Sequence, residues 1–505
     1  MNFITNIWFA LSPTWHSIIF AMLTVFLAYK YLTRNHNYWK DRGVPFVPPV
    51  FLAGSLWEVF SGKAQIGRHL GHLYTQFPGE PYFGIYIMGK PYLVIRNPDI
   101  IKNITIRDFA NFDDRTFACD KKADPMAGNS LFIMRNPDWK NIRNKLTPIF
   151  TSGKLKLMVP LMKKHSNDMV KYLETATDKT LNIKDVSANY MTDLVASCFF
   201  GIDSYSFGEV DSDFRIFCQN MFNLGLGDSF RLFCYFFIPK FVYWFKFRLF
   251  DTTFLQNVFN STLKYREEKK FNRNDFVDLL IGIRDTFNEK NSDVNVDTNR
   301  LVSLAITFFV AGFETTSNAL AFALYELCVN EKCQEKLREE INKVIKTEDD
   351  ITFENVQSIK YLEMVICETL RRYPFGPFLN RNCKEDYVIQ ETGFKIEKDT
   401  PVLVPIDGLH NDPEYFPEPE KFDPERFADG SKHLVAACKY LPFGNGPRNC
   451  IGDRFGGICA KVGLVYFLRK YRVEKCPTTP VPVVLEPKSP FMTPIHGLPM
   501  IVRKL

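Results

Sequence analysis

The sequence lacks several patterns that mark common classes of cofactor or nucleic-acid binding. No two cysteines are spaced C-x-x-C, and the nearest pair, Cys328 and Cys333, lies five residues apart, so structural zinc and the common iron–sulfur centres have little support. No long basic run occurs, and a net charge of +6 over 505 residues is mild, so we expect no nucleic-acid partner. No G-x-G-x-x-G fingerprint occurs, so a dinucleotide-binding site in this chain has no support.

Apolar and aromatic residues are abundant. Hydrophobic residues make up 46% of the chain and aromatic residues 15%, with 48 Phe. This composition excludes a disordered chain and favours a wide apolar interior, a membrane contact, or both. Helical patterns dominate the middle and short strand patterns lie towards both ends, so we expect a mixed α/β, predominantly helical fold. The clearest predicted elements are a hairpin over 82–95 with its turn at Gly89-Lys90-Pro91, and helices over 155–174, 297–345, 359–373 and 452–472.

The first 29 residues contain no Asp, Glu, Lys or Arg. Ile7 to Tyr29 is long and apolar enough to span a membrane, and Trp8 and Trp15 suit its interfaces. Four basic residues follow at once: Lys30, Arg34, Lys40 and Arg42. By the positive-inside rule, they place the N-terminus outside and the body in the cytosol. A cleaved secretory signal is the alternative, but a basic n-region and an evident cleavage site are missing. We expect a membrane anchor over 1–30, a basic and proline-rich linker over 31–50, and one large domain over 51–505.

Two further segments have alternative interpretations. Three prolines within residues 45–49 indicate a stiff spacer rather than an ordinary loop. Between Phe233 and Phe250, ten of eighteen residues are aromatic, and Lys240, Lys246 and Arg248 lie among them. This pattern fits a buried helix pair and, equally well, a surface that dips into the bilayer interface.

The strongest chemical pattern is the string F-G-N-G-P-R-N-C-I-G over 443–452. Its glycines, proline and asparagines predict a tight turn before a helix, where free N–H groups and the helix dipole lower the pKa of Cys450 and favour a thiolate, a soft metal ligand. One cysteine without a second ligand nearby suits the axial ligand of a cofactor-held iron. Gly446 and Gly452 would leave room for a flat macrocycle, and Arg448 can pair with its carboxylates. Taken alone, a Gly-rich loop with one Cys is more simply a structural turn around a buried thiol.

The complete string resembles the haem-ligand loop of the cytochrome P-450 monooxygenases at every fixed position, and the resemblance extends over nearly the full chain. It implies the cytochrome P-450 fold with a single N-terminal transmembrane anchor, and a haem-thiolate catalytic domain over 51–505. It also implies haem b as the cofactor, with Cys450 as the proximal thiolate ligand of the iron. Phe443 would be the aromatic ring packed beside the sulfur.

A second motif lies in the long predicted helix, at Ala311-Gly312-Phe313-Glu314-Thr315-Thr316. The apolar run before it makes a second membrane span the alternative, but Glu314 near its middle would cost about 2.5–3.5 kcal/mol. The motif resembles the oxygen-activating helix of the family. Ala311 and Gly312 would then lie over the haem, with Gly312 leaving room above the iron, while Glu314 and Thr315 pass protons to oxygen. Alternatively, Thr315 bonds back to a carbonyl of its own helix.

Other positions carry over from the family with less distinctive patterns. Trp139 and Arg143, four apart on a helix, resemble the pair that binds the haem propionates, and Arg381 lies where related members place a further propionate-binding arginine. The E-x-x-R pattern at Glu368 and Arg371 resembles the family's internal charge network, completed by Arg426. A second E-x-x-R copy begins at Glu335, on a charge-rich stretch that predicts a solvated surface pair.

The segments 273–276, 378–381 and 450–456 look most like insect microsomal members. The resemblance implies insertion of one oxygen atom of O₂ into small apolar substrates: xenobiotics, plant toxins, insecticides, or endogenous lipids and hormones. Electrons would come from NADPH through NADPH-cytochrome P-450 reductase, with cytochrome b5 as a second candidate donor. The protein would lie in the endoplasmic reticulum membrane, with its catalytic domain on the cytoplasmic side. Phe375-Gly376 departs from the family pattern and leaves substrate shape open.

Two other functions fit a haem-binding chain. One is an oxygen-independent rearrangement of hydroperoxides, against which the retained Glu314–Thr315 pair argues. The other is a haem or lipid carrier without turnover, against which the complete ligand and proton-delivery motifs argue. Oxygen uptake that depends on NADPH would separate a monooxygenase from a carrier.

Overall fold

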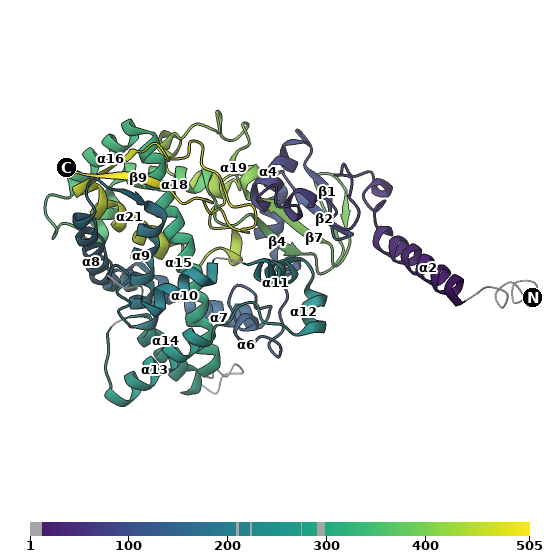
Figure 1. Ribbon diagram of the computed structural model, residues 1–505, viewed down its shortest axis with the longest axis horizontal. Helices are drawn as coiled ribbons and strands as arrows, with labels where there is room; N and C mark the ends of the chain where they lie inside the picture. The colour runs from purple at the N-terminus through teal and green to yellow at the C-terminus, as the bar shows by residue number, and fades with distance from the viewer. Residues whose placement is uncertain (1–12, 209–211, 223–224, 274, 290–297) are drawn as a thin grey trace, which may run out of the picture.

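Most of the chain is helical and packs around one long apolar helix, α15 (Thr298–Val329) (Figure 1). The structure is a computed structural model that describes residues 13–208, 212–222, 225–273, 275–289 and 298–505. The longer helices are α2 (Pro13–Thr33), α4 (Ile66–Thr75), α7 (Asp138–Leu146), α8 (Ser152–Thr175), α9 (Ile183–Val195), α10 (Asp213–Phe222), α11 (Leu226–Phe237), α12 (Pro239–Phe245), α13 (Thr253–Lys269), α14 (Phe276–Glu289), α16 (Glu331–Val344), α18 (Lys360–Arg372) and α21 (Asp453–Lys470). The short ones are α3 (Trp57–Phe60), α5 (Pro98–Lys102), α6 (Pro125–Gly128), α17 (Phe353–Ser358), α19 (Ile406–His410) and α20 (Lys432–Ala436).

The strands form small sheets at the edges of the helical body. The largest sheet has the order β1-β2-β7-β4, in which only the β2–β7 pair is parallel. A second sheet has the order β3-β9-β8, and β5 pairs with β6. The bounds are β1 (Tyr82–Ile87), β2 (Lys90–Ile95), β3 (Thr180–Asn182), β4 (Phe378–Asn382), β5 (Tyr387–Val388), β6 (Lys395–Ile396), β7 (Pro401–Pro405), β8 (Tyr471–Lys475) and β9 (Pro499–Lys504). The expected mixed α/β, predominantly helical fold is confirmed.

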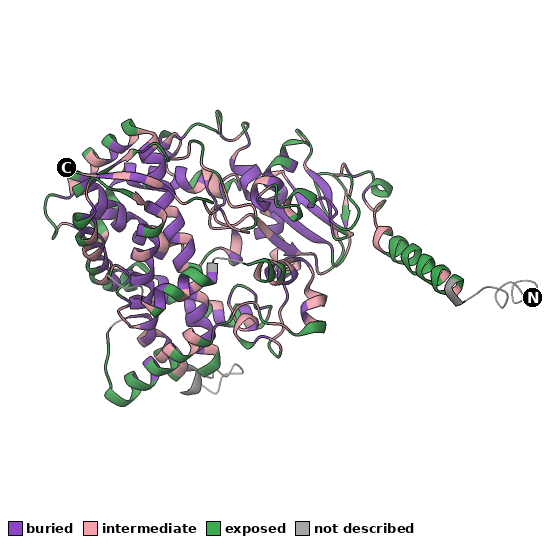
Figure 2. Cartoon of the chain, in the orientation of Figure 1, coloured by how far each residue is buried: buried purple, intermediate pink, exposed green. Residues whose placement is uncertain are grey.

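Two of the described helices are long and apolar enough to cross a membrane: Trp15–Thr33, within α2, and α15. The most apolar window of α15 is 67% buried, whereas that of the N-terminal helix is 0% buried. Figure 2 shows the same contrast between the purple centre of the body and the green N-terminal helix. The long helix is therefore the core of the body and not a second span. The predicted span begins at Ile7, and its Trp8 lies outside the described residues.

The basic, proline-rich segment after α2 is fixed to the body. Trp39 is fully buried, and its ring N–H donates to Ile85 O at 3.2 Å. The chain then runs beside β1, where Val47 N–H donates to Gly84 O at 2.9 Å. The segment predicted to be a linker over 31–50 thus packs with the body from Trp39 onward.

Two predicted boundaries were wrong for local reasons. The hairpin turns at Met88 and Gly89, both with positive φ, so Lys90 and Pro91 pair within β2; two such residues make the two-residue turn that suits antiparallel strands. The helix predicted over 297–345 is two helices, α15 and α16. Asn330 separates them, and its side-chain N–H donates to Glu326 O at 2.8 Å, a local bond that competes with helix continuation.

Candidate active site

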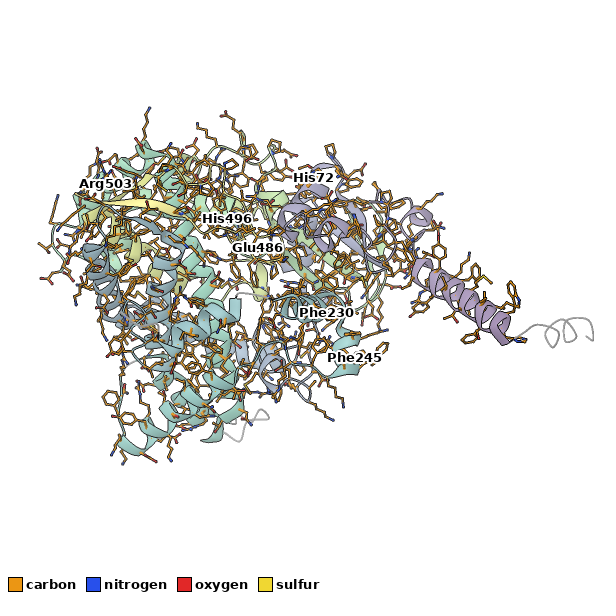
Figure 3. All side chains as sticks on the ribbon, viewed as in Figure 1. His72, Phe230, Phe245, Glu486, His496 and Arg503 are labelled. Atoms are coloured by element: carbon orange, nitrogen blue, oxygen red, sulfur yellow. The ribbon has the colours of Figure 1, made fainter. Side chains whose placement is uncertain are left out.

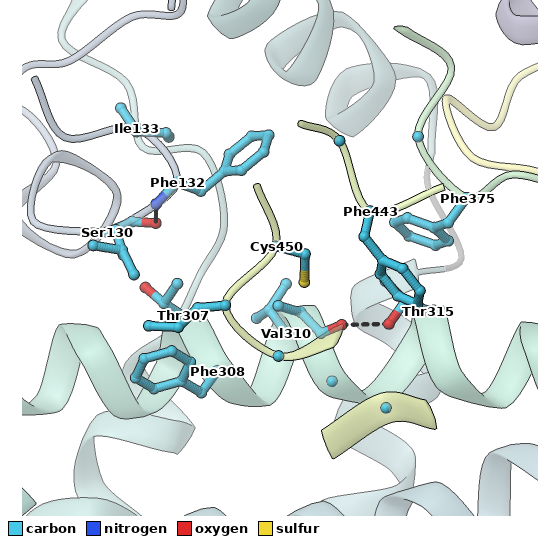
Figure 4. A pocket seen from close by; sticks show the side chains of 18 of the residues that line it. Ser130, Phe132, Ile133, Thr307, Phe308, Val310, Thr315, Phe375, Phe443 and Cys450 are labelled. Carbon is cyan, nitrogen blue, oxygen red and sulfur yellow. Dashed lines mark hydrogen bonds between the residues drawn. The ribbon is translucent and has the colours of Figure 1, made fainter. Parts of the chain in front are cut away.

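A mostly apolar cavity of about 480 Å³ lies between α15 and the loop that precedes α21. Twelve phenylalanines line it, together with Trp139 and Tyr235. Figure 4 shows the two opposing sides, with Cys450 on the loop and Val310 and Thr315 on the helix. The cavity is suited to an apolar guest because almost all of its wall consists of carbon atoms.

The loop over 442–452 adopts the tight turn that its sequence predicts. Gly444 and Gly446 have φ of 73° and 67°, in the left-handed region. Cys450 N–H donates to Phe443 O at 2.8 Å and so closes the loop. The Cys450 sulfur points from the loop towards α15 (Figure 4). Cys450 is accessible from the cavity, and Phe443 and Gly452 line the cavity beside it.

The thiol of Cys450 does not follow the simple helix-dipole expectation. Its pKa is raised, chiefly because the surrounding protein removes it from water. The N–H of Gly452 and the guanidinium groups of Arg143 and Arg115 act in the opposite direction and lower the pKa, but burial outweighs them. The N–H groups at the start of the helix thus act in the predicted direction, but the net shift of the Cys450 pKa is upward. A bound cation would lower it.

The role expected for Gly446 also requires correction. A Cβ on Gly446 would lie 1.9 Å from Thr105 O, and Gly446 does not line the cavity. This glycine lets the loop pack against the short helical segment Asn103–Arg107 and not against a macrocycle. Gly452 does line the cavity, and a Cβ there would meet only Phe150, at 4.0 Å. Space for a flat group is therefore available at Gly452.

On the opposite wall, Ala311 and Thr315 face the cavity. The Thr315 hydroxyl donates to Ala311 O at 2.6 Å, which uses its only proton and leaves its oxygen lone pairs as acceptors. Gly312 borders the cavity, but its missing Cβ would point at Phe199 and Val195, at 3.4 and 3.5 Å. That is ordinary contact, so Gly312 also lets α15 lie close to α9; the space that it leaves above an iron stays a prediction.

Glu314 lies on a different side of α15 from Thr315. It is buried, does not line the cavity, and binds Lys184 of α9, with 2.9 Å between Lys184 Nζ and Glu314 Oε1. Asn318 Nδ2 donates to the same carboxylate oxygen at 3.1 Å. The Lys184 contact could not be predicted from the sequence, because the two residues are 130 positions apart.

Four arginines surround one end of the cavity: Arg115, Arg143, Arg381 and Arg448. Arg448 Nε donates to Asp113 O at 2.8 Å, and its guanidinium lies 3.9 Å from the centre of the Trp139 ring. Arg143 donates twice to Asn449, at 3.0 and 2.8 Å, and so joins α7 to the cysteine loop. Trp139, Arg143, Arg381 and Arg448, predicted from separate segments, are thus brought together.

These arginines carry more positive charge than their surroundings balance. Burial and the neighbouring guanidinium groups lower the pKa of Arg448 to about 9, and burial lowers that of Arg381 to about 10. Arg381 Nε is buried without a hydrogen-bond partner. A group with two carboxylates would balance the buried positive charge and could accept a hydrogen bond from Arg381 Nε. The cavity therefore fits haem: an apolar slot, a sulfur directed into it, and a cationic end for two propionates.

Arg115 was missed in the sequence and belongs to this cluster. Its Nη1 donates to Phe132 O at 2.6 Å, and its guanidinium lies 4.2 Å from the Phe132 ring centre. Its pKa is lowered well below the usual range by burial and by Arg381, Arg448 and Arg143. The local sequence D-D-R-T has no cofactor pattern, so only the folded arrangement reveals it.

Glu368 and Arg371 form a fully buried, two-pronged ion pair beneath the loop. Arg371 Nε and Nη2 donate to the carboxylate at 2.7 and 2.9 Å. Arg426 Nε is 3.6 Å from Glu368 Oε1, and the Arg426 side chain is held by Glu418 O. The second E-x-x-R copy forms an ion pair in which the Glu335 side chain is 54% exposed.

Known proteins resemble this chain over nearly its full length. The profile of the family described as "Cytochrome P450" matches residues 44–501. Cytochrome P450 6k1 of Blattella germanica is 37% identical over 504 residues, which cover 96% of each protein. Cytochrome P450 6j1 of the same species is 35% identical over 97% of this chain and 98% of its own length. Cytochrome P450 6a2 of Drosophila melanogaster is 35% identical over 97% and 99%, respectively.

Proposed function

The chain belongs to the cytochrome P450 family, and from that premise we propose that it oxidises small apolar substrates at the endoplasmic reticulum membrane with electrons from NADPH. The observation that carries this proposal is the single sulfur of Cys450, directed into a mostly apolar cavity with four arginines at one end. The overall reaction takes a substrate C–H, O₂, two electrons and two protons to a substrate C–OH and water.

The cofactor proposed for the cavity is haem b. When bound, haem would supply the iron at which O₂ is activated. Cys450 would supply its thiolate ligand. Arg115, Arg143, Arg381 and Arg448, with Trp139, hold the propionates, because their positive charges need an anionic partner.

Protons reach the cavity from the helix side. Thr315 Oγ1 faces the cavity and can accept a hydrogen bond from water while it donates to Ala311 O. Glu314 lies behind it and can take up a proton and pass it on. Ala311 forms the wall beside Thr315 and leaves room for a guest because its side chain is one methyl group.

The substrate is selected chiefly by shape and apolar contact. The wall is largely aromatic, so a flat or aromatic guest gains contact area and ring stacking. Phe375 and Phe491 stack with centroids 4.2 Å apart at the cavity wall. Xenobiotics, plant toxins, insecticides and endogenous lipids or hormones all fall within this chemical class.

The protein contacts the membrane at two places in this proposal. Helix α2 anchors the chain, with the body on the cytoplasmic side, where NADPH-cytochrome P-450 reductase and cytochrome b5 can deliver electrons. The second contact is the α11–α12 region. In α12, Trp244 is 75% exposed and Phe245 63% exposed, whereas Val242 is buried. Figure 3 shows Phe230 and Phe245 on the side of the body from which α2 projects. The basic residues Lys240, Lys246 and Arg248 suit lipid headgroups.

The function is tested with purified chain and reductase. The reduced carbon monoxide complex should show the thiolate-type absorption band, and NADPH should drive oxygen uptake that an apolar substrate accelerates. Cys450→Ser should abolish the thiolate band while the fold is retained. A thiolate-type spectrum in that variant would refute the ligand assignment, and haem binding without NADPH-dependent oxygen uptake would favour a carrier.

A further inference from the structure

We propose that Lys184 of α9 is a positioning residue for proton supply to the cavity and that it acts through Glu314. The inference rests on the proposed function, since it assigns a partner to one of the groups that would move protons. It concerns a contact between two helices and not the cavity wall itself.

Thr315 and Glu314 lie on different sides of α15, and only Thr315 lines the cavity. Adjacent residues on a helix point about 100° apart. Thr315 lines the cavity, whereas Glu314 packs towards α9 and contacts Lys184 Nζ at 2.9 Å. Lys184 Nζ also donates to Ser317 Oγ at 3.0 Å, so it binds two residues of α15 that are nearly one turn apart.

The burial of this pair makes the cation necessary. The side chain of Glu314 is 6% exposed and that of Lys184 is 13% exposed. A carboxylate withdrawn from water without a cation favours its protonated form. A group that keeps its proton cannot take up another, so it cannot relay protons. Lys184 is the cation placed beside this buried carboxyl group, with 2.9 Å between Lys184 Nζ and Glu314 Oε1.

Other charged groups near this site are occupied elsewhere or carry no positive charge. On α10, Arg215 lies 3.7 Å from Asp185, the residue after Lys184, and Cys218 of the same helix is buried. On α15, Asn318 donates to Glu314 Oε1 but is neutral. Among the ion pairs of the described residues, Lys184 is the cation that reaches Glu314.

The backbone of Lys184 is held by hydrogen bonds that are separate from the ion pair. Lys184 N–H donates to Asn182 Oδ1 at 3.2 Å, the cap that starts α9. Asn182 Oδ1 also accepts from Leu498 N–H at 2.8 Å, and Asn182 pairs with Pro499 between β3 and β9. The β3–β9 pairing thus positions the backbone of Lys184 at the start of α9.

A purely structural ion pair that joins α9 to α15 is the alternative. The two helices are already packed by apolar side chains, such as Val195 of α9 against Gly312. A buried ion pair adds little net stability to such an interface. The alternative predicts changes in stability only, whereas the proposal predicts a change in the ionisation of Glu314 and in the use of electrons.

The first test measures the Glu314 carboxyl directly in the haem-loaded enzyme. Infrared difference spectra are taken at neutral pH between Lys184→Met and the double variant Lys184→Met/Glu314→Gln. A protonated carboxyl band is expected in this difference and is expected to be missing from the corresponding difference between wild type and Glu314→Gln. Identical differences in the two backgrounds would overturn the proposal. This readout needs no turnover, so it decides about Lys184 even if the proposed NADPH-dependent reaction fails.

The second test follows electrons in the reconstituted system. Lys184→Met should bind haem normally but lose severalfold more of the NADPH electrons as hydrogen peroxide, and Lys184→Arg should restore product formation. Asp185→Asn is the matched control, because it breaks the neighbouring ion pair on the same turn of α9 without touching Glu314. Peroxide loss in Asp185→Asn equal to that in Lys184→Met would overturn the proposal.

If Lys184→Met does not accumulate as haem protein, the comparison moves to the Glu314→Gln background, where no buried carboxylate remains unpaired. There, Lys184→Met should leave the ratio of product to NADPH unchanged, since Lys184 acts through Glu314. A further loss in the double variant would show an independent role and overturn the proposal.

Discussion

Replacement of Glu368 by alanine should prevent the accumulation of folded, haem-loaded protein. Both side chains of the Glu368–Arg371 pair are 0% exposed. The Glu368 carboxylate accepts two bonds from Arg371 and one, at 3.0 Å, from Asp423 N–H. Alanine removes these acceptors but leaves the Arg371 guanidinium buried, where the remaining acceptors are neutral: backbone carbonyls such as His410 O and Pro419 O, and Asn411 Oδ1 at 3.4 Å.

The expected loss of stability is large compared with the total. Removing one partner of a buried ion pair costs about 3–5 kcal/mol, and folded domains are stable by about 5–15 kcal/mol. About a fifth of the stability, or more, would therefore be lost. Glu335→Ala is the matched control, because it removes the glutamate of the same E-x-x-R pattern from a surface pair that contributes about 0–1 kcal/mol.

The assay compares haem content per polypeptide, from the reduced carbon monoxide spectrum, with the urea concentration at which the haem band is lost. Glu368→Ala should yield little haem protein, and what remains should unfold at much lower urea, whereas Glu335→Ala should match the wild type. Equal haem content and equal urea midpoints for the two variants would refute the assignment of different roles to the two copies of the pattern.

Two further variants test the cavity and the membrane contact. Thr315→Ala should bind haem and consume NADPH but divert most electrons to hydrogen peroxide, whereas Thr315→Ser should keep much of the coupling. An unchanged product yield per NADPH in Thr315→Ala would refute the role in proton delivery. The Thr315 hydroxyl would then serve only to bond the Ala311 carbonyl of its own helix. Deletion of residues 2–29 should leave a protein that still binds lipid vesicles in high salt, and adding Trp244→Ala and Phe245→Ala should release it. A deletion variant that stays soluble beside vesicles in low salt would exclude the second membrane contact.

The parts of the site that lie on continuous motifs could be predicted from the sequence. The turn around Cys450 and the helix that carries Ala311 and Thr315 have local patterns of glycine, proline and apolar spacing, and local patterns determine local backbone. Gly446 shows the limit of this reasoning. Its positive φ is a local property, but the Thr105 carbonyl that excludes a Cβ comes from a segment far away in the sequence.

The electrostatics of the site could not be predicted in this way. Arg115 joins the cluster of four cavity arginines only because the fold places it beside Arg448, whose carbonyl accepts from Arg115 Nη2 at 3.4 Å. The pKa of Cys450 rises because the protein around the cavity removes the thiol from bulk water. Lys184 reaches Glu314 across a helix interface. In each case the property depends on burial and on partners far apart in the sequence, and neither leaves a local signature.

Hydrogen bonds connect the ion pair of α18 to the cysteine loop, although about eighty residues separate Glu368 from Cys450. Arg371 holds His410 through its carbonyl, and His410 Nε2 accepts from Leu441 N–H at 2.8 Å, at the start of the loop. Burial and the charge of Arg371 lower the pKa of His410 to about 3, so the ring stays neutral and Nε2 can act as an acceptor. The Tyr440 hydroxyl donates to Cys367 O of α18 at 2.8 Å. Loss of the ion pair should therefore displace the sulfur as well as weaken the fold, and haem binding and folding should fail together.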